Sequence, residues 1–127
     1  MRDASARVMP YTKYCGIWTF VDIDAGRSYI RVKKIDSNTF LLKRGLEDNS
    51  ISPPFKSTSS DRDETTLYAY NGDLAIRYIS EKNLKENKII YSYETILRMR
   101  SANKLTYVNK RSEGRARVKK YECKRIN

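Results

Sequence analysis

The sequence predicts an all-β protein, an eight-stranded antiparallel up-and-down barrel or a barrel-like sandwich. Three observations lead to this prediction. Eight short segments alternate apolar with polar residues, as strands with one buried face do. Compact turns join most of these segments, and no helical pattern lies between them, which is typical of an antiparallel meander. Eight strands also suffice to close such a meander into a small barrel with a lined interior.

The predicted strands are rich in β-branched and aromatic residues. They cover residues 16–23, 28–35, 39–44, 65–70, 73–80, 89–100, 105–110 and 115–126. Asn71 and Gly72 form the strongest hairpin signal, because both tolerate the left-handed conformation of a type I′ turn. Gly26 supplies the positive φ of the first turn. We expect a long loop at 46–63 and a charged loop or single helical turn at 81–88.

One domain accounts for the chain of 127 residues. Residues 1–14 read as an irregular or short helical lead, and residues 15–127 as a single β-barrel domain. No stretch approaches the roughly 18 apolar residues that a membrane-spanning helix needs, and the lead lacks the apolar run of a secretory signal. We therefore expect no membrane span.

Positive charge is concentrated in the last two strands. The net charge is +11, and residues 104–127 hold nine Lys or Arg against two Glu. Two interpretations stay open: a solvated outer face, or a footprint for a polyanion such as nucleic acid or an acidic protein surface. The residues that would bind nucleic acid are Lys110, Arg111, Arg115, Arg117, Lys119 and Lys120.

The chain has two cysteines and no histidine. Cys15 starts the first strand and Cys123 lies near the end of the last, so antiparallel pairing of these strands would bring the two ends side by side. A disulfide closing this loop of about 100 residues would add up to about 4–5 kcal/mol. It would indicate a periplasmic or secreted protein, whereas two separate thiols would indicate the cytoplasm.

Catalytic and metal chemistry finds no support in the residue types present. The absence of histidine excludes every His-based triad and His-metal site, and two cysteines alone do not make a zinc site. Asp22 and Asp24 share a strand face but precede a turn, where Asp is common. We expect no enzyme, no metal and no cofactor.

Ten tyrosines are many for this length. Tyr78, Tyr91 and Tyr93 fall on predicted strands, where tyrosine suits pocket walls because it joins an apolar ring to one polar group. Three interpretations stay open: ordinary sheet packing, a lined cavity, or a platform on which bases stack beside the basic strands.

Gly16-Ile17-Trp18 at the start of the first strand, followed by the meander, resembles the lipocalin-like (calycin) barrels. In that family a G-x-W motif opens the first strand, its Trp plugs the closed end, and a basic residue of the last strand packs over it. The resemblance implies that part for Arg125 or Arg117, with Arg125 better placed. It also implies a non-enzymatic binder of a small hydrophobic ligand, or an interaction module. The candidate ligand-binding residues are Trp18, Phe20, Tyr78, Tyr91, Tyr93 and Arg125.

Two other functions stay open beside small-ligand binding. One is a basic β-domain that binds nucleic acid through residues 104–127. The other is a subunit that docks on a larger assembly, either acidic or capsid-like.

Overall fold

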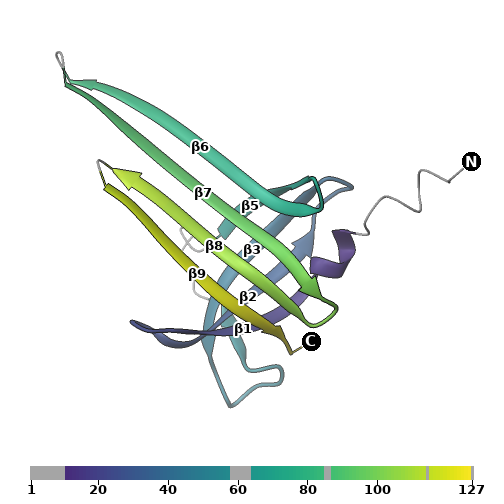
Figure 1. The fold of residues 1–127 in the computed structure, drawn as a ribbon. Coiled ribbons are helices and arrows are strands. Elements are labelled where there is room, and N and C mark those ends of the chain that lie inside the picture. The colour runs from purple at the N-terminus through teal and green to yellow at the C-terminus, as the bar shows by residue number, and fades with distance from the viewer. Residues whose placement is uncertain (1–10, 58–63, 85–86, 114, 127) are drawn as a thin grey trace, which may run out of the picture.

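Nine strands and one 3₁₀ helix make up the described part of the chain in the computed structural model (Figure 1). That part covers residues 11–57, 64–84, 87–113 and 115–126, without the side chains of 57, 79–91 and 113–116. The elements are η1 (Tyr11–Tyr14), β1 (Gly16–Asp22), β2 (Gly26–Lys34), β3 (Thr39–Glu47), β4 (Phe55–Ser57), β5 (Glu64–Tyr70), β6 (Asp73–Leu84), β7 (Asn87–Ser101), β8 (Lys104–Glu113) and β9 (Arg115–Arg125).

The sheet closes on itself. Each barrel strand pairs antiparallel with its neighbour in the sequence, with β3 followed by β5, and β9 returns to pair with β1. The closing contact is short: Trp18 pairs with Arg125 and Thr19 with Lys124, and the amide of Ile126 donates to the carbonyl of Ile17 at 2.9 Å. The result is an eight-stranded up-and-down barrel, with β4 as an additional strand beside β3. This confirms the predicted fold class in its barrel form.

The β6–β7 hairpin runs well past the barrel (Figure 1). The pair stays in register from Leu74 opposite Leu97 to Leu84 opposite Asn87, whereas β5 pairs with β6 only up to Ala75. The expected loop or helical turn at 81–88 is therefore wrong. A hairpin that leaves the barrel needs no apolar face on a core, so its charged residues do not end the strands.

The expected loop 46–63 is also partly strand, because β4 lies within it and pairs with β3. On the outer surface of the barrel, Phe55 of β4 is buried together with Ile17 and Tyr29. Gly45 of β3 makes this approach possible, since a Cβ there would lie 2.3 Å from Phe55 Cε2. Residues 58–63 of the expected loop lie outside the described residues.

The core sits at the end of the barrel that η1 covers. Tyr14 of η1 is fully buried, and its hydroxyl donates to the carbonyl of Gly72 at 2.7 Å and accepts from the amide of Met99 at 2.9 Å. The last turn of the expected N-terminal lead is thus part of the barrel. The other large side chains that are fully buried are Trp18, Phe40, Ile30, Leu42, Leu67, Leu74, Leu97 and Leu105.

Candidate functional site at the open end of the barrel

Trp18 and Arg125 meet at the closed end. The Trp18 ring is fully buried, its Nε1 donates to the carbonyl of Tyr14 at 3.0 Å, and the Arg125 guanidinium carbon lies 4.2 Å from the ring centroid. The guanidinium also donates to the carbonyl oxygens of Ala102 at 3.1 Å and Cys15 at 2.8 Å, and to that of Lys13. The contact that the resemblance implied is present, with Arg125 in that position. Its three nitrogens are all bonded to backbone, so Arg125 holds the closed end together.

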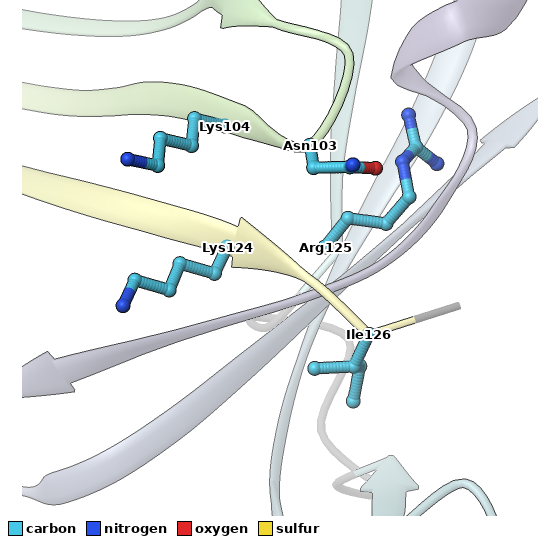
Figure 2. A pocket seen from close by; sticks show the side chains of 5 residues that line it. All are labelled: Asn103, Lys104, Lys124, Arg125 and Ile126. Atoms are coloured by element: carbon cyan, nitrogen blue, oxygen red, sulfur yellow. The ribbon is translucent and has the colours of Figure 1, made fainter.

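A shallow hollow of about 510 Å³ lies outside the barrel beside Arg125. Figure 2 shows Lys104 and Lys124 extending side by side in one direction, while Arg125 points away from them toward the N-terminal segment. The two lysines are direct register partners on β8 and β9. The hollow is open and no aromatic side chain lines it, so we do not take it as the ligand site.

Along the barrel the interior changes from apolar to cationic. Strand register arranges the inward side chains of β6, β7, β8 and β9 in rows. From the core outward, the rows read Leu74–Leu97–Tyr107–Tyr121, then Ile76–Thr95–Asn109–Lys119, then Tyr78–Tyr93–Arg111–Arg117. We call the third of these the lip row. The open end of the barrel is therefore the polar end.

A hollow of about 230 Å³ lies within this mouth. Its wall comes from β3 on one side and from β8 and β9 on the other, so it spans the lumen. The residues that line it are Arg44, Asn109, Arg111, Arg117, Lys119 and Tyr121. Four of the six are arginine or lysine, which makes the hollow a place of positive potential.

Asp22 is the buried carboxylate next to this hollow. It accepts hydrogen bonds from the Tyr121 hydroxyl at 3.0 Å and the Asp24 amide at 2.9 Å, and one oxygen lies 4.0 Å from Arg44 Nη2. The amide of Asp24, more than any other group, lowers the pKa of Asp22. Burial, together with the bond to Asp22, raises the pKa of Tyr121 to about 12. Near neutral pH Asp22 is therefore charged, Tyr121 is a neutral donor, and the cations outnumber the carboxylate.

A second, shallow hollow of about 520 Å³ adjoins the first through Arg111, which lines both, and Glu64 also borders it. Its walls include Ile76, Tyr78 and Tyr93, and the Arg111 guanidinium carbon lies 5.7 Å from the Tyr93 ring centroid. Thr95 Oγ1 lies 2.9 Å from the Tyr93 hydroxyl oxygen, which fixes the ring in this wall. The mouth thus joins a tyrosine-lined part to a cationic part.

The structure does not bring the six predicted ligand-binding residues together. Trp18 and Arg125 lie at the closed end, and Phe20 packs in the core, with its ring centroid 4.6 Å from that of Tyr121. Of the five whose side chains are described, only Tyr78 and Tyr93 line the mouth. The side chain of Tyr91 lies outside the described residues.

The six predicted nucleic-acid-binding residues divide between two faces. Arg111, Arg117 and Lys119 line the mouth. Lys110 and Lys120 occupy alternate positions and so face outward, and the Lys110 ammonium lies 3.5 Å from a Glu94 carboxylate oxygen. The side chain of Arg115 lies outside the described residues.

Of the two alternatives for the cysteines, the disulfide is absent, because both cysteines are free thiols. The register of β1 on β9 sets Trp18 opposite Arg125, which places Phe20 rather than Cys15 across from Cys123. Cys15 comes just before β1 and is five residues from Phe20 in the chain, about 16 Å away at the rise of a strand, so it lies too far from Cys123 for a disulfide. A periplasmic or secreted location loses the support that a disulfide would have given it.

The sequence analysis missed Arg44, Asn109 and Tyr121 as lining residues. The signal that could have found them was the alternation within each strand, which places every second side chain on the inward face. Arg44 follows Phe40 and Leu42 at intervals of two, as Asn109 and Arg111 follow Leu105 and Tyr107. Along each of these strands the inward face therefore turns from apolar to polar in the same direction.

Comparisons with family models, curated protein sequences and solved structures gave no match. Within the described ranges, none of the helical structure has the length and apolar character to cross a bilayer.

Proposed function

We propose that this chain is a binding protein with a lipocalin-like barrel, and that it binds a small anionic ligand in the barrel mouth. The observation that supports this most is the hollow in the barrel mouth lined by Arg44, Arg111, Arg117 and Lys119. The guanidinium group suits such a ligand, because its planar fork donates two parallel hydrogen bonds to a carboxylate or phosphate.

The pairing of like charges supports an anion in particular. Arg111 and Arg117 are direct register partners, and like charges directly opposite each other destabilise a sheet. An anion bound between the two guanidinium groups would relieve that repulsion. The pair of arginines does not stabilise the fold when no ligand is bound, so its presence favours a role in binding a ligand.

A hydrophobic ligand is less well supported. The apolar half of the interior holds a single cluster of the chain's own packed side chains, which includes Trp18, Phe40, Leu67 and Leu105. A hydrophobic molecule in the mouth would instead remove water from cations without pairing them, which is unfavourable.

Nucleic acid along the last two strands is also less well supported than a small anion. The basic side chains there are divided between the mouth and the outer face, and Lys110 is already paired with Glu94. A strand of phosphates lying on one face would meet only some of these cations.

Calorimetric titration with phosphate, citrate and a fluorescent fatty acid tests the proposal. We expect binding of the multivalent anions that weakens with added salt. Arg117→Gln should lower their affinity about ten-fold or more, the equivalent of about 1.4 kcal/mol, because it removes a charged hydrogen-bond donor.

Lys104→Gln is the matched control, since it removes one charge from the outer face at the closed end. It should change the affinity less than two-fold. If no anion binds, or if both variants lose affinity equally, the mouth is not the site. Fatty-acid binding that Arg117→Gln leaves unchanged would favour the hydrophobic ligand instead.

A further inference from the structure

The lip row places two aromatic rings beside two arginines. Tyr78, Tyr93, Arg111 and Arg117 lie directly opposite one another on β6, β7, β8 and β9, on the face that continues the barrel interior. Neighbouring strands lie about 4.8 Å apart, so the centre of the tyrosine pair is about 10 Å from the centre of the arginine pair. A ligand that used both halves would carry a ring and an anionic group joined by a spacer.

The aromatic half offers a surface on which a ring can stack. Tyr78 is 55% exposed although it faces the concave side, where it borders the 520 Å³ hollow with Ile76 and Tyr93. The Tyr93 hydroxyl is also within 3.4 Å of Thr65 Oγ1, which adds to the bonding that fixes this ring. Every nucleobase has a π-face, and stacking on tyrosine is a common means of binding it.

The cationic half suits a group with two negative charges. Four cations line the 230 Å³ hollow. The buried Asp22 neutralises part of the charge of Arg44, and the Lys119 ammonium lies 3.4 Å from a carboxylate oxygen of Asp24. About two positive charges are then left for a ligand, which matches a phosphate monoester near pH 7.

From these two halves and their spacing we infer that the ligand is a mononucleotide, with its base over Tyr78 and Tyr93 and its phosphate between Arg111 and Arg117. This inference rests on the proposed function and specifies its ligand class. A nucleotide meets the spacing because a sugar separates base from phosphate, whereas benzoate bears its carboxylate directly on the ring.

Titration of the full chain with inorganic phosphate, adenosine and AMP tests this inference. We expect AMP to bind at least ten-fold tighter than phosphate, and adenosine to bind weakly. Tyr78→Ala should remove most of that advantage and leave phosphate binding unchanged, since stacking on one ring accounts for about a ten-fold gain in affinity. Arg117→Gln should weaken both AMP and phosphate.

Tyr68→Ala is the matched control. Tyr68 is 50% exposed and alternates with the buried Leu67, so it faces outward, and its loss should leave AMP affinity unchanged. Circular dichroism should show that all three variants are folded, because none of these side chains is in the core.

The outcomes separate the two proposals. Phosphate binding at the mouth with AMP no tighter would overturn the nucleotide inference and leave the proposed function standing. No binding of any anion would remove both. If a single-stranded oligonucleotide binds far tighter than AMP and depends on Lys120 of the outer face, the ligand is a polyanion and the inference is wrong.

Discussion

Replacing Trp18 with alanine should remove a large share of the stability of the fold. The indole is fully buried and contacts both η1 and Arg125. Truncation of a buried Trp to Ala costs about 3–5 kcal/mol, and the lost cation–π contact adds about 0.5–2 kcal/mol. At roughly 0.05–0.15 kcal/mol per residue, a chain of 127 residues has a free energy of unfolding of roughly 6–19 kcal/mol. A loss of about 3.5–7 kcal/mol would therefore be plain in a urea titration.

A double-mutant cycle isolates the contact itself. Arg125→Met keeps the apolar stem of the side chain but removes the charge over the ring and the bonds to Cys15 and Ala102. We expect Trp18→Phe and Arg125→Met to be non-additive by about 1 kcal/mol, because the guanidinium carbon lies 4.2 Å from the centroid of a fully buried ring. Far-UV circular dichroism should follow unfolding, since Trp18 is the only tryptophan.

Two results would refute this account of the closed end. One is a Trp18→Ala variant that loses less than about 1 kcal/mol, far below the cost of emptying a packed core site. The other is additivity within about 0.5 kcal/mol in the cycle, as for residues that do not touch. Iodide quenching gives an independent check, since a buried indole should be quenched only weakly in the folded protein.

Three further predictions concern other parts of the fold. Gly45→Ala should lower the free energy of unfolding by about 1–3 kcal/mol, because its Cβ would lie 2.3 Å from Phe55 Cε2. Thermal unfolding measures this loss. The double variant Gly45→Ala/Phe55→Leu should recover part of it, because the clashing ring is then gone. The pKa of Tyr121 is raised to about 12, so in a titration followed by absorbance its phenolate should form at a higher pH than that of an ordinary tyrosine. The ordinary tyrosine pKa is about 10, so the stability that protonated Tyr121 contributes is fully present below pH 10 and is lost as the pH rises toward 12. The Tyr121→Phe variant should lack this pH dependence. Burial raises the pKa of Cys123 to about 12, so its thiol should resist thiol reagents until unfolding, and mild oxidation should not link it to Cys15.

Local patterns in the sequence were enough to predict an eight-stranded antiparallel barrel or a barrel-like sandwich. Alternation within each segment fixes which side chains share a face, because the side-chain period of a strand is two. The Asn71-Gly72 turn was predicted from residue type alone and has φ values of 48° and 87°. Trp18 and Arg125 were paired through a resemblance, and the two residues are in contact because both lie where the first strand meets the last.

Register and closure were decided by the tertiary structure. They depend on the sum of many pairings between strands far apart in the chain, and a shift of a few residues changes which side chains meet. That is why Cys15 and Cys123 seemed to be neighbours although Phe20 lies opposite Cys123, and why the basic residues of the last strands read as one patch although alternate side chains face opposite ways. The mouth itself joins Arg44 to Arg117 across 72 intervening residues, and only the closed ring of strands brings these two cations around one hollow.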